Sequence, residues 1–202
     1  MQTLLDILAS GVHDAKNQLF QAESLLVAAE TRHGIDLGEA RYAIEAAARR
    51  LNRTLTAYRL GRHEQALAIV PTVVGDVCDE VLLAQRPHLA AASKTLVVDC
   101  QVFDEWPLDR ELLTDILNNA VQNAGRFARS QIRLSAGLED GGLRLTVDDD
   151  GPGYASLPPA GGTGLKLAET LARLHVRHGR HGRLELANHG PLGGARFALW
   201  LP

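Results

Sequence analysis

This sequence has few cysteines, no long apolar run and no large excess of one charge. Its two cysteines, Cys78 and Cys100, have no Cys-x-x-Cys spacing, and both lie among apolar residues. We expect buried, reduced thiols of a cytoplasmic protein, because disulfides are rare in the cytosol. A disulfide between them is the less favoured alternative.

No apolar run approaches the ~18–20 residues that a membrane-spanning helix needs. The first residues, Met1–Asp6, already carry an acid and lack the basic start and apolar core of a signal peptide. The net charge is only -3, whereas a general nucleic-acid binder normally has a basic balance. We therefore expect no membrane span and no nucleic-acid partner.

The 202 residues suffice for one large domain or two small ones. Residues 2–62 have helical periodicity, with two apolar stripes. The first stripe consists of Leu4, Leu8, Val12, Ala15, Leu19, Leu26 and Ala29. The second consists of Leu37, Ala40, Ile44, Ala47, Leu51, Leu55 and Tyr58. Gly34 can end the first helix, Asp36 and Glu39 can form a capping box for the second, and Gly61 can end it.

Two helices joined by a short turn form a hairpin. Such a hairpin cannot enclose a core alone, because each helix exposes the flanks of its stripe. Pairing with a second copy into a four-helix bundle solves this problem, so we expect a homodimer. The alternative is that the hairpin packs onto the second half of its own chain.

From about residue 70 the pattern changes to helices interspersed with strands. We expect helices over about 73–87, 108–128 and 164–177, and strands over 95–100, 132–138, 143–147, 184–187 and 195–201. This order indicates one mixed sheet backed by helices. The predicted fold class is α+β, with a helical hairpin for dimerisation over residues 1–66 and an α/β sandwich over residues 67–202.

The first candidate site is the run His13-Asp14-Ala15-Lys16-Asn17 in the first helix. A hydrogen bond from one imidazole nitrogen of His13 to Asp14 leaves the other nitrogen free to attack phosphorus. Asn17 lies one turn further on the same face, where its amide can position a water or a phosphoryl group. Taken alone, a helical His-Asp pair is more typical of a solvated surface.

The second candidate site lies in the helix expected over 108–128. Asn119, Asn123 and Arg126 share one helical face, because they are spaced by four and seven residues. Amide oxygens suit Mg²⁺, and an arginine can hold phosphate oxygens. A polar helix surface is the alternative, but asparagine is a poor helix former and Asn118 adds a third within this short stretch.

Two glycine-containing segments complete the candidates. Asp149-Asp150-Gly151-Pro152-Gly153 follows a predicted strand, where glycine allows close approach of a flat ligand and a buried carboxylate can accept a hydrogen bond from the amine of adenine. An acidic turn, the alternative for this segment, uses the same residue types.

The last candidate segment, Gly161-Gly162-Thr163-Gly164-Leu165, opens a helix. Its free backbone N–H groups suit an anion, and the alternative is a flexible helix start that contains the same glycines.

In this order, the four segments resemble those of bacterial two-component sensor histidine kinases, and the likeness extends to the last strand, Gly194–Pro202. His13–Asn17 resembles the H box, Asn119–Asn123 the N box, Asp149–Gly153 the G1 box and Gly162–Leu165 the G2 box. The joint match is more specific than any single box. It implies a Bergerat-type (GHKL) ATP-binding fold behind the phospho-accepting hairpin.

By this resemblance, His13 is the phospho-acceptor, Asp14 aids its deprotonation, and Asn17 serves in removing phosphate from the partner regulator. Asn119 and Asn123 would serve Mg²⁺ bound with ATP, and Asp149 would bind adenine. The other nucleotide-binding residues would be Arg126, Gly151, Gly153, Gly162, Thr163 and Gly164.

Gyrase and mismatch-repair ATPases share this nucleotide fold but place a water-activating glutamate one turn before the magnesium asparagine. Here that position is Asn119, which cannot act as a base. The difference favours phosphoryl transfer to a protein residue, achieved by positioning and by metal-assisted charge neutralisation.

Three features depart from the family pattern. No sensor segment precedes the hairpin, so we expect a separate sensor protein to supply the signal. Eight residues, none of them phenylalanine, separate Gly153 from Gly162, where the family has a longer lid. A short lid is expected to weaken ATP retention or autophosphorylation. Lys166 stands where the family has a glycine, and we expect it to face solvent.

A further group, His175, His178 and His181, straddles a helix end and a glycine turn. A metal site needs convergent ligands with a supporting shell, so we do not expect one here.

The sequence thus predicts an ATP- and Mg²⁺-dependent protein-histidine kinase that autophosphorylates His13 and passes the group to an aspartate of a response regulator receiver domain. The alternative is a histidine phosphotransfer protein whose ATP-binding domain is degenerate. The retained Asn119, Asn123 and Asp149 favour the kinase, whereas the short lid and the missing sensor favour the relay. A regulator-directed phosphatase using Asn17 is a third hypothesis.

Overall fold

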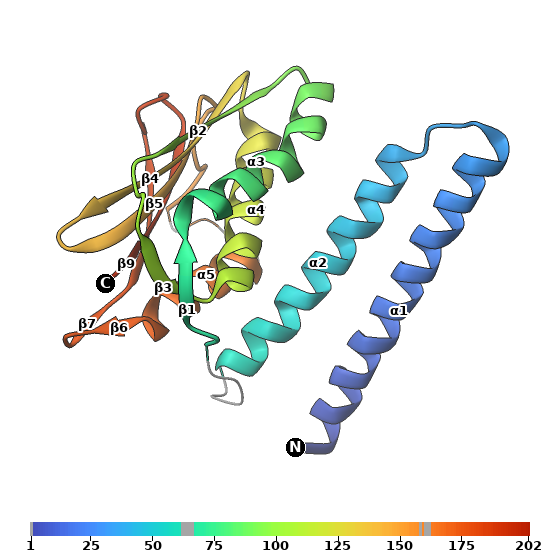
Figure 1. Cartoon of the computed structure of the whole chain (residues 1–202), viewed down its shortest axis with the longest axis horizontal. Helices are drawn as coiled ribbons and strands as arrows, with labels where there is room; N and C mark the ends of the chain where they lie inside the picture. Colours follow the sequence, from blue (N-terminus) through green and yellow to red (C-terminus); the bar gives the residue numbers. More distant parts are fainter. Residues whose placement is uncertain (1, 62–66, 158, 160–162) are drawn as a thin grey trace. The chain divides into compact units, whose positions relative to one another are not determined.

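The computed structural model of the chain describes residues 2–61, 67–157, 159 and 163–202. The chain divides into two compact units, Met1–Gln65 and Ala66–Pro202 (Figure 1). Within the described ranges, none of the helices combines the length and the hydropathy that crossing a membrane requires.

The first unit is a helical hairpin. It consists of α1 (Gln2–His33) and α2 (Gly38–Gly61), which pack along each other (Figure 1). Gly34 follows α1 with a φ of +64°, the left-handed conformation of a helix C-cap, as the sequence predicts.

The turn between these helices is anchored by two acids. The Glu30 carboxylate accepts the N–H of Leu37 at 2.9 Å and pairs with Arg41 at 3.1 Å. Asp36 Oδ1 accepts the N–H of Gly38 at 2.8 Å and so caps the start of α2. Because α2 begins at Gly38, Asp36 lies two residues before the helix, one residue further from it than the predicted N-cap position.

Apolar side chains of the hairpin remain accessible. Phe20 is 70% exposed and Leu25 is 66% exposed. Where burial is described in this unit, at residues 11, 14–15, 17–48 and 51, no residue is fully buried. Two helices alone therefore leave this hairpin without a closed core.

Within its described residues, the second unit contains three sheets, one of which is a short hairpin described below. In the other two-stranded sheet, β1 (Val70–Val73) pairs antiparallel with β3 (Glu105–Leu108). The largest sheet has five strands in the order β2-β4-β5-β9-β8. They are β2 (Thr95–Cys100), β4 (Gln131–Glu139), β5 (Gly142–Asp149), β8 (Arg183–Asn188) and β9 (Ala195–Leu201). β2 and β4 run parallel, and the other neighbours are antiparallel.

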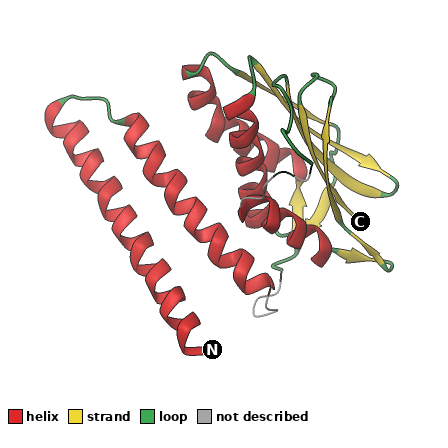
Figure 2. Cartoon of the chain, turned by 180° about the vertical axis from the view of Figure 1, so that it is seen from behind, coloured by secondary structure: helices red, strands yellow, loops and turns green. Residues whose placement is uncertain are grey.

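Three helices lie on one face of the large sheet (Figure 2). They are α3 (Val74–Ala91), α4 (Arg110–Phe127) and α5 (Thr163–Leu174). Fully buried leucines such as Leu117, Leu145 and Leu167 fill the space between helices and sheet. The predicted mixed sheet backed by helices is therefore confirmed.

Two predicted helix ends are wrong. α3 passes through Pro87 and ends at Ala91, because Pro87 is exposed and water can satisfy the carbonyl that it leaves unpaired. α5 ends at Leu174 rather than near 177. A short hairpin follows, made of β6 (Val176–Arg177) and β7 (Arg180–His181). Its turn residues His178 and Gly179 both have positive φ, which suits a tight hairpin turn.

Both cysteines are free, as predicted. Cys78 is buried, but Cys100 is only partly buried because β2 is an edge strand. Burial, together with the neighbouring Cys100, raises the pKa of the Cys78 thiol. Cys78 therefore remains a protonated, unreactive thiol.

Candidate functional site

Asp149 stands at the centre of the candidate site, at the end of β5. Its Oδ1 accepts hydrogen bonds from the N–H of Gly151 at 2.8 Å and from the N–H of Ala195 at 3.1 Å. The residue is only 3% exposed. Because both donors address one oxygen, the carboxylate is held in a fixed orientation and Oδ2 remains the acceptor for a ligand.

Glycines allow the backbone to close around this carboxylate. A β-carbon on Gly151 would lie 2.5 Å from the carbonyl oxygen of Phe127, and one on Gly194 would overlap Asp149. The loop after β5 therefore packs directly against the end of α4 and the start of β9. A side chain at either glycine would force these segments apart.

One of the two candidate asparagines of α4, Asn119, meets the start of α5. Asn119 and Asn123 lie one turn apart and are both partly buried. A β-carbon on Gly164, in the first turn of α5, would overlap the side-chain amide of Asn119. The second and fourth sequence motifs, which are far apart in the chain, are thus brought together.

Other polar residues of α4 point elsewhere. Asn118 is buried, and its Oδ1 accepts a hydrogen bond from Gln85 of α3 at 2.7 Å. It joins two helices and contributes nothing to the asparagine face that the sequence analysis considered. Arg126 is exposed in the last turn of α4, and Lys166 on α5 is exposed as expected.

Asp150, next to Asp149, has a structural role. Its carboxylate accepts the N–H of Arg129 at 2.7 Å and the hydroxyl of Ser130 at 2.7 Å. Partial burial by itself would raise the pKa of Asp150, but these hydrogen bonds, with backbone donation from Ser130, lower it to about 2. Asp150 stays ionised and ties the connection between α4 and β4 to the end of β5.

Asn188 at the end of β8 fixes the loop that follows Gly153. Its side-chain amide accepts the N–H of Tyr154 at 2.6 Å and donates to the carbonyl of Tyr154 at 3.0 Å. Burial and the charge of Asp149 raise the pKa of the Tyr154 phenol to about 12. Sequence analysis missed Asn188 and Tyr154, because no local spacing marks a contact between a strand end and a loop.

A partly buried ion pair supports the same end of the sheet. Arg196 on β9 donates to the two carboxylate oxygens of Asp148 at 2.6 and 2.9 Å, across the β5–β9 ladder. Asp148 is 1% exposed, and its charge is compensated by this two-pronged contact. An arginine within an otherwise apolar last strand was the signal that could have revealed the pair.

The remaining candidate residues lie apart from Asp149 in the sequence. His13, Asp14 and Asn17 are all on α1, and the side chains of Asp14 and Asn17 are exposed. The His13 side chain lies outside the described residues. So do Gly162 and the side chain of Thr163.

The three histidines do not converge. His175 Nδ1 contacts the carbonyl of Leu171 at 2.8 Å, and His181 Nδ1 contacts the carbonyl of Arg173 at 3.0 Å. Across the described part of the chain, no group of histidine, cysteine and acidic residues has an arrangement suited to a metal ion.

The segment that contains this site matches a known family. Residues 108–202 match the sequence profile of the family "Histidine kinase-, DNA gyrase B-, and HSP90-like ATPase". This segment includes α4, β5, α5 and β9, the elements that meet at the site.

Curated proteins that share part of their sequence with this chain are sensor kinases. The chain is 31% identical over 166 residues to the sensor histidine kinase CpxA of Escherichia coli, with 71% of this chain and 35% of that protein covered. It is 32% identical over 183 residues to the sensor protein kinase CarS of Pseudomonas aeruginosa, with 80% of this chain and 38% of that protein covered. The chain thus spans little more than a third of the length of these curated relatives.

Solved structures share the fold. The Acinetobacter baumannii histidine kinase AdeS has a TM-score of 0.66 at 16% identity, covering 92% of this chain and 95% of that one. Full-length ShkA in complex with AMPPNP has a TM-score of 0.66 at 22% identity, covering 98% and 45%. These similarities identify the chain as a member of the two-component histidine kinases, and as the core of such a protein.

Proposed function

We propose that this chain is an ATP-dependent protein-histidine kinase that phosphorylates His13 and transfers the phosphoryl group to an aspartate of a response regulator. The observation that carries the proposal is the oriented, buried carboxylate of Asp149, which is surrounded by glycines. One of them, Gly151, packs against the end of α4, the helix that carries Asn119 and Asn123. Membership in the histidine kinases supports this kind of reaction.

The residues around Asp149 fit an adenine nucleotide. The carboxylate Oδ2 can accept a hydrogen bond from the exocyclic amine of adenine, because Oδ1 is already occupied by backbone donors. The close packing of Gly151 and Gly194 leaves no side chain between this carboxylate and a planar base. ShkA, a structural neighbour, was solved with the nucleotide analogue AMPPNP.

Asn119 and Asn123 would hold the magnesium ion that accompanies ATP. Both supply neutral amide oxygens from one face of α4, and Mg²⁺ prefers oxygen ligands while keeping several waters. Neither side chain can act as a general base toward water, which disfavours hydrolysis. Arg126, Gly153, Gly162, Thr163 and Gly164 would frame the phosphates.

His13 on α1 would receive the phosphoryl group that ATP supplies. Asp14 would accept a proton or hydrogen bond from one imidazole nitrogen, leaving the other nitrogen as the nucleophile. Asn17, one turn further along α1, would act at the same face when phosphate is removed from the regulator.

We further propose that residues 1–66 form a dimeric four-helix bundle and that residues 67–202 form the ATP-binding domain. The incomplete burial of the hairpin and the exposure of Leu25 support pairing with a second copy. A cytoplasmic location is proposed by analogy, because a solved neighbour is the cytoplasmic segment of the histidine kinase QseC.

Incubation with γ-labelled ATP and Mg²⁺ tests the kinase. We expect acid-labile label on the wild type, none on His13→Gln and very little on Asn123→Ala. His33→Gln, at the other end of α1, is the matched control and should label normally. If the wild type neither binds nucleotide nor takes up label, the chain is a phosphotransfer relay instead.

Sedimentation of the full chain tests the dimer. Leu25→Glu introduces a charge on α1 and should convert the dimer to a monomer. Leu83→Glu, at a similarly exposed leucine of α3, should leave the dimer intact. A wild type that sediments as a monomer at micromolar concentration would contradict the bundle.

A further inference from the structure

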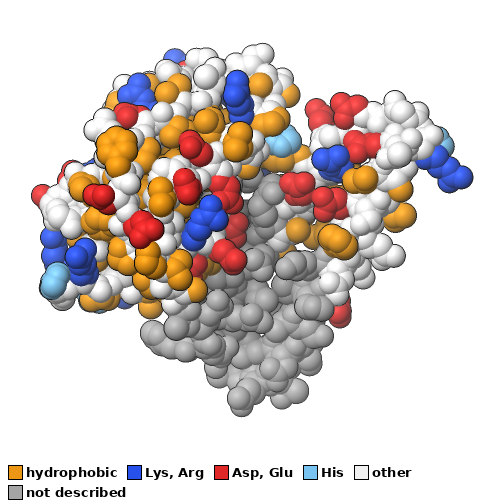
Figure 3. Space-filling model, viewed as in Figure 1, with side chains coloured by type: hydrophobic (Ala, Val, Ile, Leu, Met, Phe, Trp, Pro, Cys, Tyr) orange, Lys and Arg blue, Asp and Glu red, His pale blue; other side chains and the backbone are white. Residues whose placement is uncertain are grey.

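A strongly basic segment near the end of the chain has no part in the proposed kinase site. Between Glu169 and Glu185 the sequence contains no acid, but it contains four arginines and three histidines. They are Arg173, His175, Arg177, His178, Arg180, His181 and Arg183. Figure 3 shows arginine and histidine side chains gathered at the edge of the second unit where β6 and β7 lie.

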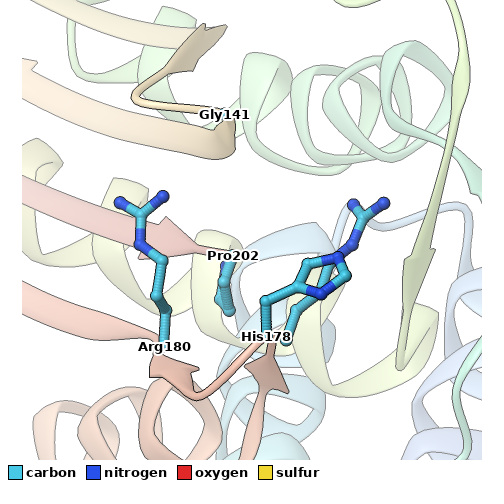
Figure 4. Close-up of a pocket in the computed structure, with 5 residues that line it drawn as sticks. Gly141, His178, Arg180 and Pro202 are labelled. Atoms are coloured by element: carbon cyan, nitrogen blue, oxygen red, sulfur yellow. The ribbon is translucent and has the colours of Figure 1, made fainter.

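A cavity of about 180 Å³ opens beside this hairpin. It is lined by Arg177, His178 and Arg180, with Gly141 from the β4–β5 turn and Pro202 completing the wall. Figure 4 shows Arg180 and His178 on either side of Pro202, below Gly141. The volume is ample for several waters or for one small oxyanion.

Both arginines of the cavity are held in place by tryptophans. The Arg180 guanidinium lies 4.6 Å from the ring centre of Trp200, and the Arg177 guanidinium lies 5.9 Å from that of Trp106. Arg180 also donates to the carbonyl of Asp140 at 2.7 Å. Stacking and this hydrogen bond orient the Arg180 guanidinium before any ligand arrives, which reduces the entropy lost on binding. The Arg177 guanidinium is oriented by its contact with Trp106 alone.

The charges of these two arginines are not neutralised within the described part of the chain. Other arginines there pair with acids, as Arg183 does with Glu185 at 2.6 Å. Neither Arg177 nor Arg180 forms an ion pair with a described carboxylate. Two fixed guanidiniums next to one cavity, with donors left over, match a doubly charged tetrahedral anion better than a single carboxylate.

We propose that the cavity between the β6–β7 hairpin and the β4–β5 turn binds a phosphate dianion, either free or as a phosphomonoester, through Arg177 and Arg180. His178 adds a third polar group at the rim. The site is distinct from the nucleotide site proposed around Asp149, because it is built from other residues on β6, β7 and the β4–β5 turn.

The test uses the tryptophans that lie under the two arginines, which are the only two of the sequence. The full chain is titrated with inorganic phosphate at constant ionic strength, and the indole N–H resonances and the fluorescence are recorded. We expect a saturable change. Arg177→Gln and Arg180→Gln should each weaken binding at least about tenfold, because each removes a charge-assisted contact.

Arg86→Gln, at an exposed arginine of α3, is the matched control and should bind as the wild type does. Arg177→Lys keeps the positive charge but loses the planar guanidinium with its paired N–H donors, so this variant should also bind phosphate less tightly. Dispersed indole resonances in each variant show that it is folded. Glycerol phosphate extends the titration. Binding of both probes assigns the site to phosphomonoesters, and binding of inorganic phosphate alone assigns it to the free ion.

Three results would overturn the proposal. The first is no saturable change with phosphate. The second is an equal response to succinate, which would make the site a general anion site. The third is a response that persists in the Arg177→Gln/Arg180→Gln double variant but disappears in Asn123→Ala, which would put the phosphate in the nucleotide site. Failure of the kinase assay would leave this titration unaffected.

Discussion

Replacing Asp149 with asparagine changes one functional group at the centre of the proposed adenine site. The Gly151 and Ala195 N–H groups require an acceptor at the position of Oδ1. They therefore orient the new amide with its oxygen toward them and its NH₂ toward the ligand. That NH₂ group would meet the exocyclic amine of adenine, donor against donor.

The magnitude follows from these contacts. The variant keeps both backbone hydrogen bonds, so we expect its free energy of unfolding to change by less than about 1 kcal/mol. Adenine loses one charge-assisted hydrogen bond, a loss of about 2–3 kcal/mol, or on the order of 30- to 150-fold in affinity. Guanine carries a carbonyl at the equivalent position, so guanine nucleotides should lose much less or gain.

Titration with fluorescent ATP and GTP analogues, together with urea unfolding, measures both quantities. Asp150→Asn is the matched control, because its carboxylate contacts Arg129 and Ser130 instead of a ligand. It should bind ATP as the wild type does. Unchanged ATP affinity in Asp149→Asn would refute the assignment of Asp149 to adenine. A large loss of stability would refute the predicted amide orientation.

Three further predictions concern packing and charge. Gly164→Ala should weaken nucleotide binding at least about tenfold in the same titration, because its methyl group would overlap the side-chain amide of Asn119. Gly75→Ala is the control, because a β-carbon there meets no atom within 4 Å. It should leave nucleotide binding unchanged and change the free energy of unfolding by between zero and a stabilisation of about 1 kcal/mol. The pKa of Asp150 is lowered to about 2, so its contribution to stability is full above pH 4 and is lost as the pH falls toward 2. Urea unfolding at pH 7 should therefore show a loss of about 1 kcal/mol for Asp150→Asn, which shrinks toward pH 2. Arg196→Met leaves the buried Asp148 unpaired and should cost about 3 kcal/mol by urea unfolding, and adding Asp148→Leu should recover most of that loss.

Local patterns of the sequence were sufficient for most of the secondary structure. The apolar repeats predicted α1 and α2 because helix hydrogen bonds are local and their period is regular. The helix expected over 108–128 and the strands expected over 132–138 and 143–147 are confirmed as α4, β4 and β5. The ends of α3 and α5 were wrong, because proline is tolerated on an exposed surface and a His-Gly pair can form a hairpin turn.

The roles of individual polar residues were harder to predict. Asn118 and Asn119 are adjacent asparagines that the sequence alone does not distinguish. Asn118 accepts a hydrogen bond from Gln85, whereas Asn119 lies against Gly164. A rotation of only 100° along the helix separates the two environments. The sequence contains no information on which side of α4 receives α3 and which receives α5 until both helices are packed.

The sequence by itself determined the order of the motifs, the hairpin and sandwich architecture, and Asp149 as a carboxylate at a strand end. Only the tertiary structure decided that Gly151, Gly194 and Ala195 close around that carboxylate and that Asn188 holds the loop after it. The division has a physical reason. Helix and strand patterns repeat over a few residues, whereas these contacts join segments that meet only when the sheet and its helices pack together.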